Sequence, residues 1–325
     1  MRNCRLLLLS AALHSSSALH VGPRLAAHPV SHSLAVSRGR PVFLADAVVE
    51  SEEPADEPAS TAGAVQRARA WLTKWWKFDK VIRKGWTPDE MVARMDNAGV
   101  EKHCMMQFKM KSYKEDRIII DVTDEEMAEV IEVHPDRFIG FAGINPLLGM
   151  DGVRAMERGI TEFGFKAAYL HVYGFNIPID HRRLYPFYAK CEELDVPVSM
   201  QVGHSAESMP SEHARPMLLD NIALDFPGLT IVGTHTGWPW CEEMIAMAWK
   251  HDNVYVGMDA HMPKYWDKSL QTFVKTRGQD KVLWGTNGPT AFTHDHILPQ
   301  VHELGLKHSV KKKLLRDNAI KVLGL

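Results

Sequence analysis

Pro197-Val-Ser-Met-Gln-Val-Gly-His204 and Leu229-Thr-Ile-Val-Gly-Thr-His235 are two apolar runs that each end in a histidine. Short, nearly continuous apolar runs of this kind are typical of buried parallel strands. The residue just past such a strand faces the open mouth of a (β/α)8 barrel. We therefore expect His204 and His235 on neighbouring strand ends, pointing into one pocket. The alternative is that each histidine only caps its strand by bonding a backbone group.

Strands and helices alternate through the rest of the chain, at the spacing of roughly 30 residues that repeated βαβ units have. The expected strands are residues 103–108, 137–144, 165–172, 196–202, 229–234, 253–258 and 281–286. A barrel needs an eighth strand, and the only upstream candidate is Pro41-Val-Phe-Leu-Ala45. The alternative, an open doubly wound sheet, usually carries a Gly-rich first turn that this sequence lacks. The pattern therefore favours an α/β fold of the TIM-barrel type.

Composition excludes several classes of protein. The chain has 325 residues, a net charge of −2 and 17 histidines. It lacks the sustained basic patch of a nucleic-acid-binding protein and any apolar run of transmembrane length. Its four cysteines form no Cys-x-x-Cys pair, so a disulfide framework or a zinc knuckle is not expected. A small molecule is the expected partner, and nucleic acid and membrane are not.

The first 45 residues contain no Asp or Glu, and Arg2 and Arg5 precede a leucine-rich run. This composition predicts a targeting presequence, residues 1–45, for a plastid or a mitochondrion. An acidic, disordered linker is expected at 46–63, followed by a barrel domain at 64–325. The first helix of that domain, 64–78, carries three tryptophans and is the expected contact of a homodimer.

Helix ends are marked further along the chain. Thr87-Pro88-Asp-Glu90 has an N-cap, a first-turn proline and an acid at the capping-box position, and Gly99 supplies the stop. Thr123-Asp-Glu-Glu126 predicts a second helix start. His294 and His296 follow Thr293 and are expected on the surface.

The site candidates lie mainly at strand ends. Neutral imidazole is a common ligand of zinc and similar ions, and a catalytic metal keeps about three protein ligands. His204 is one expected ligand, and His235 is a second ligand or a general base. Asn287 follows the last strand and points into the same mouth. It has an oxygen but no charge, so it is a weak ligand and a poor base.

Further candidates would contact the substrate. His171 follows the fourth barrel strand, and Asp259-Ala-His261 follows the seventh. We expect the side chain of Trp238 to form one side of the pocket. Lys166 lies within the fourth strand, where it would become carboxylated or, more simply, pair with a barrel carboxylate.

From about Ala70 to Leu325, the sequence resembles the amidohydrolase-related family, which includes resorcylate and aminocarboxymuconate-semialdehyde decarboxylases. The motifs that carry the resemblance are Trp86-Thr-Pro-Asp-Glu-Met-Val-Ala-Arg-Met-Asp-Asn-Ala-Gly-Val100, His134-Pro-Asp-Arg-Phe138, Gly203-His204, Thr234-His-Thr-Gly-Trp238, Gly285-Thr-Asn287 and Asn318-Ala-Ile-Lys-Val-Leu323. Each motif is weak alone, but their order and spacing are specific.

The resemblance implies a (β/α)8 barrel with a divalent metal, for which zinc is our expectation, and a homodimer. It implies that His204 is the strand-five metal ligand. It also implies that His235 is the strand-six histidine, which activates the metal-bound water or protonates the substrate. Asn287 falls where the family has a metal-binding aspartate.

The chain departs from the family at the first strand. The family has Asp-x-His-x-His or a variant there, and this sequence has no such motif. Leu44-Ala-Asp-Ala-Val-Val-Glu50 offers only Asp46 and Glu50. Three explanations are open: chemistry with little or no metal, a first strand lost from the gene model, or a barrel that no longer catalyses.

Two functions follow. The first is an enzyme that decarboxylates a small carboxylated or cyclic molecule without oxidation, or hydrolyses one with a metal-bound water. In the decarboxylation, His235 would protonate the carbon as carbon dioxide leaves. The second is a catalytically impaired or non-catalytic barrel retained for ligand binding or subunit interaction.

Overall fold

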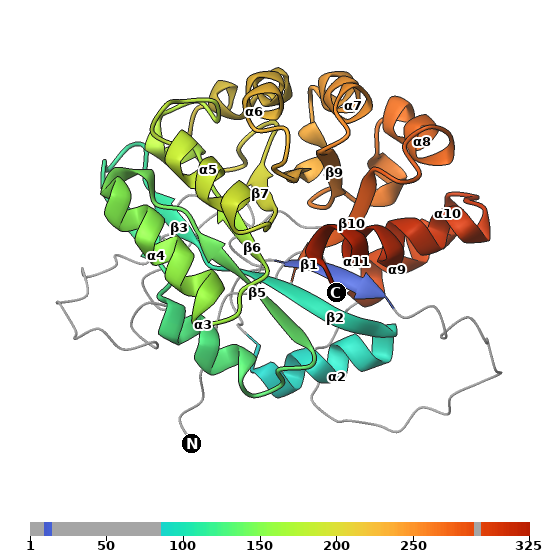
Figure 1. Cartoon of the computed structure of the whole chain (residues 1–325). Helices are drawn as coiled ribbons and strands as arrows, with labels where there is room; N and C mark the ends of the chain where they lie inside the picture. Colours follow the sequence, from blue (N-terminus) through green and yellow to red (C-terminus); the bar gives the residue numbers. More distant parts are fainter. Residues whose placement is uncertain (1–9, 15–85, 289–293) are drawn as a thin grey trace, which may run out of the picture.

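Seven parallel strands form a curled sheet in the computed structural model, which describes residues 10–14, 86–288 and 294–325 (Figure 1). The strands are β2 (Val100–Met106), β5 (Phe138–Gly143), β6 (Ala167–Leu170), β7 (Val198–Gln201), β8 (Ile231–Thr234), β9 (Val254–Met258) and β10 (Val282–Gly288). They coincide, within a few residues, with the seven strands predicted from the apolar runs. The prediction of an α/β barrel is confirmed.

The gap between β10 and β2 is closed by β1 (Ser10–His14), which runs antiparallel to both neighbours. Figure 1 shows this strand in blue between β2 and β10. All strands of a regular (β/α)8 barrel are parallel, so the first position departs from the pattern. We predicted Pro41–Ala45 for this position, but Ser10–His14 fills it, and residues 41–45 lie outside the described residues.

Several other predictions fall on undescribed parts of the chain. These are the rest of the presequence at 1–45, the acidic linker at 46–63, and the tryptophan helix at 64–78. β1 itself comes from the segment that we predicted to be a presequence.

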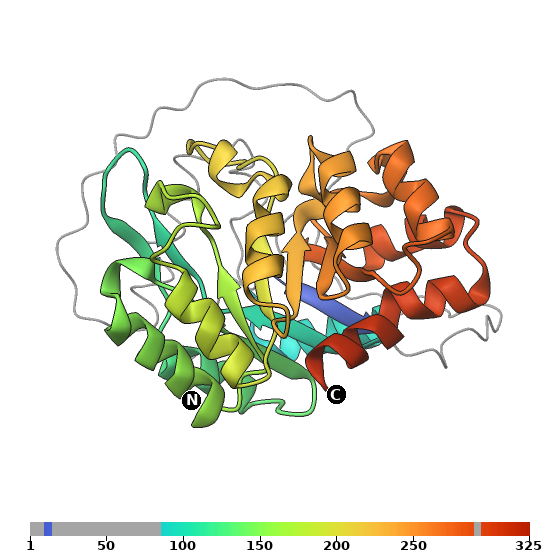
Figure 2. The same ribbon diagram turned by 45° about the horizontal axis from the view of Figure 1, so that its top comes forward.

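Helices cover the outer face of the sheet in both views (Figures 1 and 2). They are α2 (Pro88–Ala98), α3 (Asp124–Ile131), α4 (Met150–Thr161), α5 (Tyr185–Glu193), α6 (Leu219–Asp225), α7 (Cys241–Lys250), α8 (Lys268–Lys275), α9 (His294–Glu303) and α10 (His308–Lys312), and a further helix, α11 (Asn318–Leu323), lies across one end of the barrel. None of the helices in the described ranges is long and apolar enough to cross a membrane.

The predicted helix caps are confirmed. The Thr87 hydroxyl accepts a hydrogen bond from the Glu90 backbone N–H, and the Glu90 carboxylate accepts one from the Thr87 N–H. Gly99 ends α2 in the left-handed conformation, with φ of 69°. Thr123 and Glu126 form the same reciprocal pair at α3.

Two features were not predicted. A hairpin of β3 (Lys109–Lys111) and β4 (Ile118–Asp121) follows β2, and its strands are too short to show a period in the sequence. His294 was expected on the surface, which is wrong. It is the first residue of α9, and its Nε2 lies 3.2 Å from Nδ1 of the buried His103 on β2. His296, two residues further, is exposed as predicted.

The alternation of side chains along the strands divides the core in two. Ala168 belongs to the cluster between the sheet and the helices. Ala167 belongs to a second cluster inside the barrel, with Phe141 and Leu283. Residues of α11 join this inner cluster at the end where the strands begin, because α11 lies across that end of the barrel (Figure 2).

Asn318 should anchor α11 to the barrel. Its buried side-chain amide donates to the carbonyls of Val282 at 2.7 Å and Gln279 at 2.9 Å. We expect Asn318→Ala to lower the free energy of unfolding by about 2 kcal/mol, because the buried Val282 carbonyl and the half-buried Gln279 carbonyl lose their donor. The exposed Lys321 of the same helix is the control, and Lys321→Ala should change the free energy by no more than about 0.5 kcal/mol. Urea unfolding measures both, and equal effects would contradict this role.

Candidate active site

Left-handed backbone conformations gather at the ends of three neighbouring strands. His235 and Thr236 follow β8 with φ of 66° and 59°, Ala260 follows β9 with 61°, and Asn287 lies near the end of β10 with 65°. Such conformations are uncommon for residues other than glycine, and they cluster at functional sites. They mark the mouth of the barrel, formed by the carboxyl ends of the parallel strands.

Gly203, in the loop after β7, packs closely against the loop after β8. Its φ is +96°, and an added Cβ would lie 2.4 Å from the carbonyl oxygen of Trp238. That carbonyl accepts a hydrogen bond from the backbone N–H of His204 at 2.8 Å. Only glycine permits this approach, so the Gly-His pair positions His204 beside the Trp238 loop.

Three rings form a row along one side of the mouth. The rings of His204 and Trp238 meet edge to face at 4.7 Å, and Trp238 lies 5.7 Å from His261. Burial lowers the pKa of His204, with Glu207 opposing the change and His235 adding to it. Burial, with His235 and His204 nearby, lowers the pKa of His261 to about 4. His261 is therefore a neutral hydrogen-bonding group near neutral pH.

His235 is held by Asp259, which follows β9. The Asp259 Oδ1 accepts a hydrogen bond from the His235 backbone N–H at 2.6 Å, and Oδ2 lies 3.4 Å from the His235 Nε2. Burial raises the pKa of Asp259, and the nearby His235 opposes that rise. We expected Asp259 to line the pocket, but the sequence did not reveal its pairing with His235.

A buried acid lies in the loop after β7. Glu207 accepts a hydrogen bond from the Ser205 hydroxyl at 2.5 Å, and its Oε1 lies 3.7 Å from Nε2 of His171. Burial alone would raise the pKa of Glu207, but the attraction of His171 and the hydrogen bond from Ser205 lower it to about 2. The sequence pattern did not indicate Glu207, because it lies in an irregular polar loop.

The remaining predicted residues divide between the two ends of the barrel. His171 lies just past β6 and is buried beside the ring of Tyr173. Asn287 is at the end of β10, on the rim of the mouth. Lys166 is exposed and precedes the first residue of β6. Its prediction as a substrate contact is wrong, because parallel strands begin at the end opposite the mouth.

The donor set does not fit a metal ion as it stands. Within the described ranges, no group of three or more His, Cys, Asp or Glu side chains is placed to hold one. His204 packs against Trp238, and His235 pairs with Asp259. At the first-strand position, the residue of β1 opposite Gly288 at the mouth is Ser10, and His14 pairs with Val100 at the far end.

Comparison with known proteins identifies the family. The family described as amidohydrolase matches residues 67–325, so the chain belongs to the amidohydrolase family. A gamma-resorcylate decarboxylase of Rhodococcus jostii is 31% identical over 175 residues, which cover 44% of this chain and 50% of that protein. A 2-keto-4-carboxy-3-hexenedioate hydratase of Sphingobium is 29% identical over 132 residues, covering 34% and 38%. The matched stretches span half or less of these relatives.

Solved structures share the fold. An uncharacterized TIM-barrel protein of Bordetella bronchiseptica has a TM-score of 0.63 at 24% identity and covers 81% of this chain and 90% of its own. A manganese-bound 5-carboxyvanillate decarboxylase of Novosphingobium aromaticivorans has a TM-score of 0.60 at 19% identity, covering 76% and 84%. A 2,6-dihydroxybenzoate decarboxylase of Rhizobium has a TM-score of 0.59 at 17% identity, covering 75% and 91%.

Glu207 gives a prediction on the pH dependence of stability. Its pKa of about 2 lies below the ordinary value of 4.5, so the folded state favours the carboxylate. The stabilisation is complete above about pH 5 and is lost as the pH falls towards 2. We expect Glu207→Gln to lower the free energy of unfolding by about 3 kcal/mol at pH 7.

Urea unfolding between pH 7 and pH 3 tests this prediction. The difference between Glu207→Gln and the wild type should shrink as the pH falls below 5. Glu162 is exposed and serves as the matched control, for which Glu162→Gln should change little at any pH. A constant difference at all pH values would show that packing, and not charge, stabilises this loop.

Proposed function

We propose that this protein is an enzyme of the carboxy-lyase type, which removes carbon dioxide without oxidation from a small aromatic or unsaturated carboxylate. The observation that carries the proposal is the His235–Asp259 pair at the mouth of the barrel, with 3.4 Å between Nε2 and Oδ2. The names of the relatives support this reaction class, since resorcylate and carboxyvanillate decarboxylases share the family or the fold. Hydrolysis is the second reaction class that the family permits.

In the proposed reaction, the bond between the substrate carbon and its carboxylate breaks. The electron pair stays on the carbon, and carbon dioxide leaves. Protonated His235 gives its proton to that carbon and becomes neutral, then takes up a new proton from solvent. Asp259 orients the imidazole and stabilises its charged form, as an aspartate does in other His–Asp pairs.

The other groups of the mouth bind and orient the substrate. His261 and His204 are kept towards the neutral form by burial, so they act as hydrogen-bonding groups. Trp238 lies between them and presents its ring to the mouth. A planar aromatic carboxylate suits such a wall, because its ring packs against an aromatic face.

A divalent metal in this chain is a separate proposal. Three solved structures of related fold contain manganese, which supports a divalent ion but not zinc in particular. The described donors of this chain do not complete a set of three, so no step above uses a metal. Homodimer formation and import into an organelle also stay predictions.

Turnover of a defined substrate panel tests the function. The full chain would be incubated with 2,6-dihydroxybenzoate, other hydroxybenzoates and unsaturated dicarboxylates, with added Mn²⁺ or Zn²⁺ and separately with EDTA. We expect release of carbon dioxide from at least one aromatic carboxylate. His235→Gln should lower kcat at least 100-fold, because it removes the proton donor.

His302 lies on the exposed face of α9 and supplies the matched control. His302→Gln should leave kcat unchanged. Absence of turnover across the panel, while the same compounds bind, would favour the non-catalytic barrel. Equal loss of activity in both variants would exclude His235 as the proton donor.

A further inference from the structure

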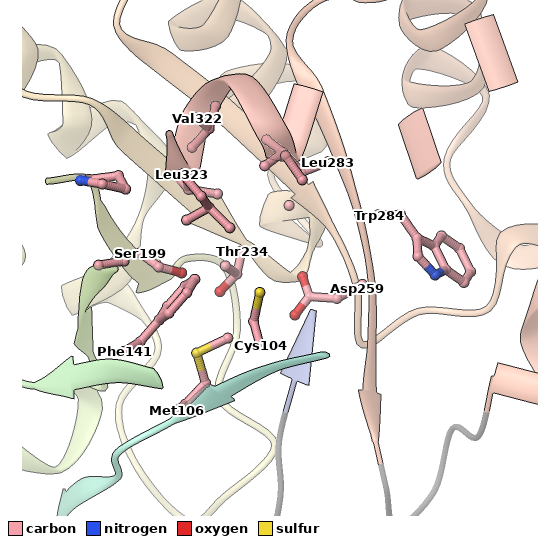
Figure 3. Close-up of a pocket in the computed structure, with 16 residues that line it drawn as sticks. Cys104, Met106, Phe141, Ser199, Thr234, Asp259, Leu283, Trp284, Val322 and Leu323 are labelled. Atoms are coloured by element: carbon pink, nitrogen blue, oxygen red, sulfur yellow. The ribbon is translucent and has the colours of Figure 1, made fainter. Parts of the chain in front are cut away.

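The inside of the barrel contains a cavity below the mouth. The centre of a water-sized sphere can move through about 40 Å³ of it, which is room for only a small group. Figure 3 shows Phe141, Met106, Cys104, Asp259 and Leu283 around it, and Trp284 to one side. The lining residues come from all seven parallel strands and from α11.

Small inward residues leave this space open. Bulky branched side chains usually fill the interior of a TIM barrel in layers. Here Ala167, Ser199, Gly257 and Gly285 are among the inward positions on four of the strands. Gly257 cannot take a larger side chain without adjustment, because a Cβ would lie 3.0 Å from the Thr234 Cα.

The cavity extends from the floor of the barrel, which is the end covered by α11, to the His235–Asp259 pair. Ala319, Val322 and Leu323 of α11 line it at the floor. Thr234 and Asp259 line it at the carboxyl ends of β8 and β9. Asp259 therefore contacts both the cavity and His235, so a group in the cavity lies next to the His235–Asp259 pair.

The cavity is lined mainly by apolar side chains, and the lining side chains that carry oxygen are Ser199, Thr234 and Asp259. Thr234 donates its hydroxyl to the Met200 carbonyl at 3.1 Å, and Oδ1 of Asp259 accepts from the His235 N–H. Burial raises the pKa of the Cys104 thiol to about 12, as expected in dry surroundings. A buried water needs two to four polar partners, and apolar cavities stay dry and take up apolar ligands.

We propose that this cavity is a binding site for a small uncharged apolar group, of methyl to ethyl size, carried by the substrate. The inference rests on the proposed function, since the carboxylate would remain at the mouth near His235 while the apolar group enters the cavity. Removing a methyl-sized group from water is worth about fourfold in affinity. The cavity would thus select alkyl-substituted carboxylates over unsubstituted ones.

Xenon tests the cavity without any need for turnover. Binding to the full chain would be followed by ¹²⁹Xe NMR and located in xenon-pressurised crystals. The neighbouring Ala167 and Ala168 are both fully buried, but only Ala167 faces the cavity. We expect Ala167→Val to weaken xenon binding at least tenfold and Ala168→Val to leave it within twofold.

A second pair of variants keeps the test valid if the first pair fails to fold. Ser199→Val also fills the cavity, and Ala128→Val, on the half-buried α3, is a second control. Xenon absent from the cavity of the wild type would overturn the proposal. Equal loss in the filling and control variants would overturn it as well.

Ligand pairs test the link to the substrate. Calorimetry would compare benzoate with 3-methylbenzoate and 4-methylbenzoate, as binding only. We expect one methylbenzoate to bind about fourfold tighter than benzoate, and Ala167→Val to remove that advantage while benzoate affinity is kept. Equal affinity for all three in the wild type would overturn selection by the cavity. Because neither experiment measures catalysis, failure of the proposed function would be seen separately, as binding without turnover.

Discussion

The parallel arrangement of the sheet is the constraint on which the site depends. The seven parallel strands all start at the same end of the barrel, so their carboxyl ends meet on one rim. Residues far apart in the chain, such as His171 and Asp259, are brought to that rim by strand order alone. The residues that follow β8 and β9 adopt left-handed conformations, which are uncommon outside glycine and cluster at functional sites.

The sequence predicted those parts of the structure that leave a periodic or local pattern. Buried strands gave apolar runs, and the cap at Thr87 gave a reciprocal Thr–Glu pair, so fold and helix starts were predicted. His204 and His235 were placed at strand ends for the same reason. The Asp259 pairing and the burial of Glu207 depend on how loops fold over one another, and loop contacts of this kind have no period in sequence. Lys166 was predicted to contact the substrate because the sequence identified its strand, but the prediction did not consider which end of that strand lies at the mouth.

The mouth holds carboxylates together with histidines whose pKa burial lowers. Four histidines, Asp259 and Glu207 share a space in which burial dominates the pKa of His204 and His261. Each of the two carboxylates faces a histidine, Glu207 facing His171 and Asp259 facing His235. The remaining rings stay neutral and present apolar faces. This separation suits a reaction in which a carboxylate must lose its charge as it leaves as neutral carbon dioxide.

The antiparallel β1 has a consequence for how the barrel forms. Neighbouring parallel strands are joined by short connections, so each pairing closes a small loop. The nearer pairing of β1, between Ala12 and His103 of β2, closes a loop roughly three times longer, which costs about 1 kcal/mol more in chain entropy. Loop-closure entropy therefore favours assembly of the seven-stranded sheet first, with ring closure as the late and slowest event.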